Sequence, residues 1–230
     1  MTSLEALALP STPPMLASAR ALLSHLAQPD RADSKSYAAH ASEQQLIERP
    51  EIILWGLEPR LLDLVENYVG LPVSYRGLTF RRDLVDGKNV ETRLWHRDDE
   101  DHRIVKVIVY LNDVTPEGGP FEYIPRRSTP PLDALKYTSG RILDHDMESA
   151  VPSSQWKSCV GSSGTVVVVD TCSVFHRGKL PTANDRFTMF FCYNSRRPKQ
   201  PQYCGPLFSK DVLLSRATGL SRRQRDAMMG

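Results

Sequence analysis

The chain lacks the features that mark several classes of protein. Its 230 residues contain no apolar run near the ~18–20 residues that cross a bilayer, and no basic segment of a signal peptide precedes Arg20. The 29 basic and 27 acidic residues nearly balance, which gives no indication of nucleic acid or a membrane surface as a partner. The four cysteines form no C-x-x-C pair, which favours reduced thiols over a zinc site or a disulfide scaffold. We therefore expect a cytoplasmic protein, and the sequence leaves its oligomeric state open.

What is present is a helical pattern followed by a strand pattern. Apolar residues at helical spacing predict helices at 15–27 and 59–68, and Ser221-Arg222-Arg223-Gln224 predicts a short C-terminal helix that reaches Met228. From Val73 the period becomes that of strands. We expect strands at 78–83, 91–97, 103–111, 120–125, 155–160, 164–170, 173–177 and 186–194. This order predicts a mainly β sandwich or barrel with flanking helices.

A chain of this length suits one domain. We expect a helical part over 1–72 that packs on the strands, a core over 73–200 and an extension over 201–230, with a loose arm at 1–14 and a loop at 30–34 within the polar stretch 28–42. Within the core, 127–163 has little pattern and three prolines, which is typical of lids, binding loops or disordered segments. We interpret it as a substrate lid that is mobile without ligand.

Three residues have the composition of an iron site. His96 and Asp98 lie two apart in the expected strand 91–97, so their side chains share a face, and His176 adds a second imidazole. Two histidines and one carboxylate leave half of an octahedral Fe(II) open for other ligands. An H-x-D pair alone is weak evidence, because a histidine at a strand end and an aspartate in a turn can both simply be solvated. We expect the other histidines at the surface: His25, His40, His102 and His145.

Two further strands carry residues that suit an anion. Arg186 begins an apolar run, where its planar fork needs an anionic partner such as a carboxylate, and Thr188 adds a hydroxyl on the same face. In the strand 103–111, Lys106 and Tyr110 share the face opposite to the valines. That face either points into the barrel, toward an anionic ligand, or is solvated with the Lys106 ammonium in water. The sequence leaves both possibilities open.

Taken in order, several motifs resemble the Fe(II)/2-oxoglutarate-dependent dioxygenases of the phytanoyl-CoA dioxygenase-like group. The resemblance covers roughly residues 75–195 and rests on Trp95-His96-Arg97-Asp98, the run 106–114, Gly118-Gly119-Pro120-Phe121, Asp170-Thr171 before His176-Arg177-Gly178, and Arg186-x-Thr188. It implies a double-stranded β-helix, the jelly-roll or cupin-like barrel, in which the second and seventh strands are neighbours and bring His96 beside His176. The chain departs from the family after Pro125, where Arg126 and Arg127 replace the usual Gly-Ser-His; they either contact an acidic substrate or are simply exposed.

The resemblance also implies a reaction. Its iron ligands and catalytic residues would be His96, Asp98 and His176; Arg186 and Thr188 would bind the far carboxylate of 2-oxoglutarate, and Lys106 and Tyr110 are further candidate contacts. Fe(II), 2-oxoglutarate and O₂ would then oxidise an unactivated C–H bond of a small metabolite, with release of succinate and CO₂. Asp98 favours oxygenation over halogenation, because related halogenases carry Gly or Ala at that position.

Three alternatives stay open. The first is a cupin-type metalloenzyme that uses no 2-oxoglutarate, and the second is a non-catalytic metal or ligand sensor on the same barrel. The third, a nucleic-acid module that uses the C-terminal arginines, is disfavoured by the near-neutral charge. The sequence does not indicate the substrate.

Overall fold

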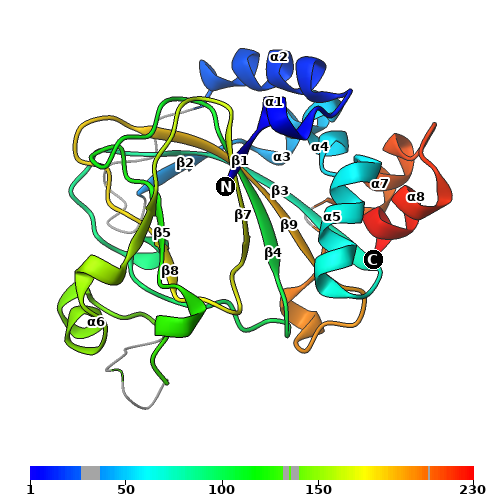
Figure 1. The fold of residues 1–230 in the computed structure, drawn as a ribbon. Helices are drawn as coiled ribbons and strands as arrows, with labels where there is room; N and C mark the ends of the chain where they lie inside the picture. Colours follow the sequence, from blue (N-terminus) through cyan, green and yellow to red (C-terminus); the bar gives the residue numbers. More distant parts are fainter. Residues whose placement is uncertain (27–36, 132–134, 136–139, 207) are drawn as a thin grey trace.

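Two antiparallel sheets form the centre of the molecule (Figure 1). The structure, a computed structural model, describes residues 1–26, 37–131, 135, 140–206 and 208–230. The larger sheet has the order β1-β7-β4-β9-β3-β2 and the smaller one β6-β5-β8. The strands are β1 (Thr2–Ser3), β2 (Ala38–His40), β3 (Val73–Asp83), β4 (Val105–Tyr110), β5 (Phe121–Tyr123), β6 (Lys157–Cys159), β7 (Thr165–Asp170), β8 (His176–Gly178) and β9 (Arg186–Ser195). The expected jelly-roll fold is confirmed, but no ladder between described strands joins the two sheets into a closed barrel.

The helices cover one face of the larger sheet (Figure 1). They are α1 (Leu4–Leu7), α2 (Thr12–Leu23), α3 (Glu43–Ile47), α4 (Pro50–Trp55), α5 (Pro59–Val69), α6 (Asp144–Ala150), α7 (Lys210–Arg216) and α8 (Arg222–Met229), and of these only α6 lies beside the smaller sheet. Strand alternation selects the face that is covered, because Val105, Val107 and Val109 of β4 are buried in the same cluster as residues of α2, α4 and α5. The opposite face of β3, β4 and β9 is therefore free to line a cavity.

The helix predictions near 59–68 and at the C-terminus are confirmed. α5 ends at Gly70, whose φ of 78° is left-handed and whose N–H reaches the Glu66 carbonyl. α8 begins with a complete capping box of Ser221 and Gln224. The loose arm expected at 1–14 is wrong, because Thr2 pairs with Val166 of β7 and α2 already begins at residue 12. The end expected for that helix, residue 27, and the expected loop at 30–34 lie outside the described residues.

One predicted strand is absent from the described fold. Residues 91–97 form a 3₁₀ turn, Glu91–Arg93, followed by isolated bridges from Trp95 to Ile142 and from His96 to His176. Arg93 is the physical reason, because its guanidinium is 1% exposed and donates to the carbonyls of Lys88, Tyr37 and Leu84. These bonds fold the chain around a buried cation and exclude an extended strand. The strand expected at 173–177 begins later, at His176.

The insertion at 127–163 contains more structure than its pattern suggested. It includes α6 and β6, and its apolar residues join a second cluster: Trp95, Ile124, Leu135, Ile142, Met147, Val151 and Phe175. This cluster packs behind the bridge that carries His96. The mobility expected for the insertion stays a prediction. Among the described residues, no helix is long and apolar enough to span a membrane.

Candidate metal centre and its cavity

His96, Asp98 and His176 lie together. One ligand atom from each residue can be chosen so that all lie within 4.8 Å of one another, and this is the only such group among the residues that the structure describes. The backbone holds the two histidines side by side, with N···O distances of 3.0 and 2.9 Å across the His96–His176 bridge. Phe121 of β5 stacks on the His176 ring at 5.5 Å. The arrangement has the donor set and the compactness of a two-histidine, one-carboxylate metal site.

Each histidine is oriented by its own backbone. Nδ1 of His96 lies 2.8 Å from the Leu94 carbonyl, and Nδ1 of His176 lies 3.2 Å from the Val174 carbonyl. A carbonyl can only accept, so both Nδ1 atoms carry a proton and both Nε2 lone pairs are available to a metal. Burial lowers the pKa of His96 to about 4, and burial together with the neighbouring His96 lowers the pKa of His176 further below its ordinary value. Both rings are therefore neutral at pH 7, as metal ligands must be.

Lys106 points inward and pairs with Asp98. Its Nζ lies 2.5 Å from Asp98 Oδ2, with the two side chains 25% and 11% exposed. Burial disfavours both charges, but the ion pair outweighs it, so the pKa of Asp98 is lowered and that of Lys106 is raised. Of the two orientations that the sequence allowed, the structure has the interior one. The anion beside Lys106 is, however, the candidate metal ligand itself.

A cavity of about 330 Å³ contains these residues. Its wall is the free face of β3, β4 and β9, completed by the segments that carry the metal ligands, by the loop before β4, by Phe121 and by Gly178. The polar residues that the three strands contribute are Arg76, Thr79, Arg81, Lys106, Arg186 and Cys192. This volume suits a small ligand. None of the described residues of the insertion 127–163 is among its lining residues, which leaves the proposed lid without direct support.

Arg186 is held by the protein's own carboxylate. Its Nη2 and Nε lie 2.8 and 3.2 Å from Asp83 Oδ2, and its Nη1 donates to the Gly119 carbonyl. Asp83 lies opposite Arg186 in the β3–β9 ladder, and the two residues are 0% and 2% exposed. The inference that a buried Arg186 requires a carboxylate from a ligand is therefore wrong as it stood, because Asp83 already supplies one.

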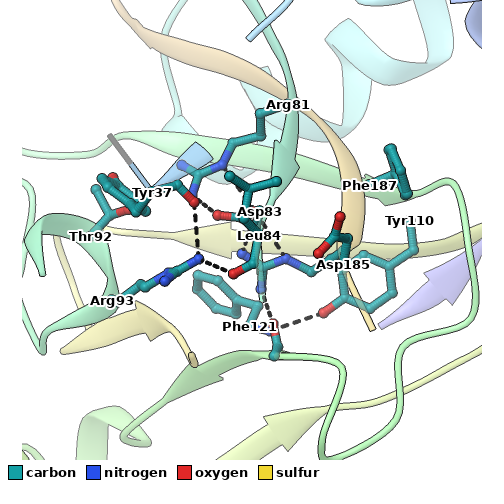
Figure 2. A network of polar contacts seen from close by, with 12 residues as sticks. Tyr37, Arg81, Asp83, Leu84, Thr92, Arg93, Tyr110, Phe121, Asp185 and Phe187 are labelled. Carbon is teal, nitrogen blue, oxygen red and sulfur yellow. Dashed lines mark hydrogen bonds and ion pairs between the residues drawn. The ribbon is translucent and has the colours of Figure 1, made fainter. Parts of the chain in front are cut away.

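A second arginine shares that carboxylate. Arg81, two residues before Asp83, places its Nε 3.0 Å from Asp83 Oδ2 and makes a second contact with Oδ1 (Figure 2). Burial opposes the charge on Asp83, but Arg186 and Arg81 together hold the pKa of Asp83 well below its usual value. Two guanidinium groups on one carboxylate leave one positive charge uncompensated. This arginine pair, Arg81 and Arg186, can therefore take a further anion.

Thr188 lies beside the arginine pair. It faces Arg81 in the β3–β9 ladder and is 0% exposed, and its hydroxyl has no hydrogen-bond partner among the described residues. A buried hydroxyl without a partner is costly, so this atom can still accept or donate one hydrogen bond. Thr188 is not among the residues that line the cavity, so its hydroxyl lies behind the arginine pair and not on the cavity surface. The sequence pattern indicates Thr188 but not Arg81 and Asp83. The signal was present, since an arginine and an aspartate two apart in a strand share one face.

Gly178 connects the arginine pair to the metal site. A Cβ at this position would lie 2.7 Å from Arg186 Nη2, so a larger residue would displace the guanidinium from its present position. Gly178 is also two residues from His176 on β8, which corresponds to about 7 Å along a strand. A ligand that binds at the three candidate metal ligands can therefore extend to the arginine pair.

Tyr110 has a different role from the one expected. Its hydroxyl donates to the Cys159 carbonyl at 2.7 Å and accepts from the Phe121 N–H at 3.1 Å; Figure 2 shows Tyr110 beside Phe121. The side chain is fully buried, and burial raises its pKa to about 12. The expectation that Tyr110 contacts the co-substrate is not supported, because both of its hydrogen bonds serve the backbone and it is not among the cavity-lining residues.

The remaining candidates are at the surface. Arg126 and Arg127 are exposed and do not line the cavity, which gives no support to a role in substrate binding. The side chain of His145 is 74% exposed and lies 3.3 Å from Asp146. His25, His40 and His102 are also exposed, as expected.

Comparison with known proteins identifies the fold. No family model and no curated protein matches the chain. Among solved structures, HygX from Streptomyces hygroscopicus with nickel and 2-oxoglutarate bound matches with a TM-score of 0.57 and 20% identity, over 79% of this chain and 78% of that one. The non-heme alpha ketoglutarate dependent epimerase SnoN from nogalamycin biosynthesis matches with a TM-score of 0.56 and 18% identity, over 81% and 77%.

A third match is EctD from S. alaskensis with 2-oxoglutarate and 5-hydroxyectoine. It has a TM-score of 0.53 and 20% identity, over 85% of this chain and 70% of that one. Identities this low establish a shared architecture. The chain therefore has the jelly-roll fold of these three structures.

Proposed function

We propose that this chain is a non-haem Fe(II)/2-oxoglutarate-dependent oxygenase that oxidises a C–H bond of a small molecule. The observation that carries the proposal is one cavity that holds both a two-histidine, one-carboxylate cluster and the arginine pair with its uncompensated positive charge. The solved structures support it, since HygX was obtained with nickel and 2-oxoglutarate and EctD with 2-oxoglutarate and 5-hydroxyectoine. Fe(II), 2-oxoglutarate and O₂ would together supply an oxidant able to remove hydrogen from an unactivated C–H bond.

The residues would form two binding sites in the cavity, one for the metal and one for the far carboxylate of 2-oxoglutarate. His96 and His176 would bind Fe(II) through Nε2 and Asp98 through its carboxylate, which leaves three coordination positions for other ligands. The far carboxylate of 2-oxoglutarate would meet the arginine pair, behind which the unpartnered hydroxyl of Thr188 lies. In this assignment Arg81 is the more accessible of the two arginines, with a side chain 10% exposed against 2% for Arg186.

The cavity lining also limits the access of water to the reacting atoms. Ile104, Phe121 and Phe190 line it alongside the polar groups, and an apolar lining limits the water that can reach the reacting atoms. Lys106 keeps Asp98 ionised and fixes one of its oxygens, so that the other oxygen points toward His176, 3.9 Å from its Nε2. The chain thus positions the ligand atoms before any metal arrives.

One observation favours an alternative. The Lys106 ammonium occupies an oxygen of Asp98, and a cation that competes with the metal is what a non-catalytic site that has lost its iron would show. The two functions differ in metal affinity, because a working site must bind Fe(II) against this ion pair. The reaction outcome is a separate question, since the matched SnoN is an epimerase.

An anaerobic titration separates these possibilities. The purified protein is titrated with Fe(II) and then with 2-oxoglutarate, and the visible absorbance of the ferrous chelate reports binding. O₂ and a library of metabolites are then added, and succinate release is measured. We expect saturable binding of both ligands, no binding of iron by His176→Ala, and a substrate-dependent increase in succinate. Tight iron binding without any 2-oxoglutarate binding would establish a different cupin-type metalloenzyme, and no iron binding would favour the non-catalytic alternative.

Arg81→Gln tests the carboxylate site in the same assay. We expect it to weaken 2-oxoglutarate binding by about 2–4 kcal/mol, the range for losing a buried charged partner, and to leave iron binding unchanged. Arg82→Gln is the matched control, because Arg82 is on the same strand but pairs with Asp185 away from the cavity. Equal losses in the two variants would exclude a specific role for Arg81.

A further inference from the structure

The strand β3 has an irregularity at the end of the cavity that is remote from the arginine pair. Its ladder with β9 pairs Tyr75 with Tyr193 and Gly77 with Cys192, so Arg76 is an extra residue at a β-bulge. A bulge redirects a side chain from the regular alternation of a strand. Tyr75 packs into the core under the helices and does not line the cavity, whereas Arg76, Gly77 and Leu78 all line it. The bulge therefore directs Arg76 to the cavity.

Arg76 is incompletely bonded there. One of its Nη atoms donates to the Tyr203 carbonyl, but its Nε is buried and has no hydrogen-bond partner among the described residues. No carboxylate of the described residues lies within ion-pair distance of Arg76. A buried guanidinium N–H without an acceptor is costly. The acceptor that would satisfy it can enter from the cavity.

The neighbouring charges do not satisfy Arg76. Lys106 lies in the adjacent row, opposite Cys192, and is paired with Asp98. Glu100 lines the cavity and its Oε2 accepts the Asp99 N–H at 3.1 Å, but among the described residues its carboxylate forms no ion pair with Arg76. The arginine pair is farther along, since Arg81 is four residues from Gly77, about 13 Å on a strand.

The metal ligands lie between these two ends. Asp98 pairs with Lys106 near the Arg76 end, and Gly178, two residues from His176, lies against Arg186 at the other end. A co-substrate bound at the arginine pair would therefore leave the Arg76 end open. A second anion could bind there on the other side of the metal.

We propose that the substrate carries an oxyanion, a carboxylate or a phosphate ester, which Arg76 binds so that the bond to be oxidised lies beside the metal. The proposal rests on the function proposed above. Arg76, Arg81, Lys106 and Arg186 face Asp98, Glu100 and the adjoining Asp83, which leaves one positive charge on the lining. A divalent metal and a dianionic co-substrate cancel, so one charge remains for the substrate to neutralise. The planar fork of arginine suits an oxyanion that accepts two hydrogen bonds.

Matched pairs of probes test this inference. The wild-type protein is loaded with Mn(II) and saturated with 2-oxoglutarate under nitrogen. Hexanoate and hexyl phosphate are then titrated, with hexanamide as the neutral partner of both, followed by a panel of branched and aromatic acids with their primary amides. Relaxation of the probe protons by Mn(II) measures both the affinity and the approach to the metal. We expect at least one oxyanion to bind near the metal at least tenfold more tightly than its amide.

Variants identify the residue responsible. Arg76→Gln should remove that preference and Arg76→Lys should keep part of it, while Arg82→Gln should behave as wild type. Preference only for the phosphate ester would identify phosphate as the oxyanion, and preference only for acids would identify carboxylate. The proposal is overturned if no oxyanion in the panel binds better than its neutral partner, or if the preference survives in Arg76→Gln.

The same samples distinguish a failure of this proposal from a failure of the proposed function. Binding of 2-oxoglutarate is measured on each variant, and the probes are also titrated with Mn(II) alone into wild type and Arg81→Gln. A wild-type protein that binds no 2-oxoglutarate, but discriminates oxyanions through Arg76, would refute the oxygenase and keep the anion site. A wild-type protein that binds 2-oxoglutarate but does not discriminate oxyanions would refute the anion site at Arg76 and keep the proposed oxygenase.

Discussion

Asp83→Asn should destabilise the protein strongly, although the substitution changes the volume of the side chain very little. The substitution keeps the shape of the side chain but removes the single carboxylate between Arg81 and Arg186, and all three residues are at least nine-tenths buried. Removing one partner of a buried ion pair costs about 3–5 kcal/mol, because an uncompensated charge remains. Here two guanidinium groups would remain, so we expect a loss at the upper end of that range. This is a large part of the ~5–15 kcal/mol that stabilises a typical domain.

Urea unfolding followed by circular dichroism measures the loss. Asp185→Asn is the control, because Asp185 also pairs with an arginine of β3, at 2.6 Å from Arg82 Nε, but both side chains are partly exposed. We expect the control to lose about 1 kcal/mol or less, the range for pairs accessible to water. A loss below about 1 kcal/mol in Asp83→Asn would refute the assignment of a buried, shared carboxylate.

A bound carboxylate should compensate the variant. With Mn(II) present, 2-oxoglutarate at 1,000 times its Kd adds about 4.1 kcal/mol to the stability of any protein that binds it only when folded. Asp83→Asn should bind 2-oxoglutarate more tightly than wild type, because its arginine pair carries two positive charges instead of one. Weaker binding in the variant would show that Asp83 positions the arginines more than it neutralises them.

The same carboxylate should govern acid stability. The pKa of Asp83 is lowered in the fold from an ordinary value of 3.8, because Arg186 and Arg81 outweigh the effect of burial. The stability that this group contributes is therefore complete above pH 3.8 and is lost as the pH falls from there through the lower folded pKa. Between pH 5 and pH 3, the urea concentration at the unfolding midpoint should fall steeply for wild type and less steeply for Asp83→Asn. Parallel lines for the two proteins would contradict the assignment.

Three further substitutions test separate parts of the site. Gly178→Ala should weaken 2-oxoglutarate binding by about 1–3 kcal/mol in calorimetry without affecting the metal, because its Cβ would lie 2.7 Å from the Nη2 of Arg186. Tyr110→Phe should cost about 1–3 kcal/mol of unfolding free energy in urea and leave 2-oxoglutarate affinity unchanged, because it strands two buried backbone groups. Asp98→Asn should abolish Mn(II) binding, seen by electron paramagnetic resonance, and keep the far-ultraviolet spectrum; retention of full metal affinity would remove Asp98 from the ligand set.

Local patterns in the sequence predicted what depends on neighbouring residues. The boundaries of α5 follow from Pro59 and Gly70, and the start of α8 follows from the capping box at Ser221, since these signals act within one turn. The alternation of β4 likewise separated its two faces, because Val105 and its partners are apolar at every second position, but only the structure shows that the valine face meets the helices. The fold class followed from the order of these elements together with the family resemblance.

The main failures depend on contacts that no local pattern describes. The strand expected at 91–97 is replaced by a turn because Arg93 binds carbonyls that include Tyr37 and Leu84, and no local pattern reports those partners. The pairing of Arg186 with Asp83 spans 103 positions and depends on the register of β3 against β9. Propensity and spacing describe the strand that carries a residue, but they do not describe the strand beside it.

This distinction explains why a correct residue can be chosen for an incomplete reason. Arg186 was selected because a buried guanidinium requires an anion, and the structure meets that requirement with Asp83 from within the protein. The requirement therefore could not by itself imply a ligand. A ligand is implied only when the charges on the neighbouring strand, β3, are counted as well. Arg81 of that strand adds a second cation to the same carboxylate. The evidence for a carboxylate ligand is thus the one positive charge that remains when Arg81, Asp83 and Arg186 of the two strands are counted together. No single arginine in the sequence could reveal that charge.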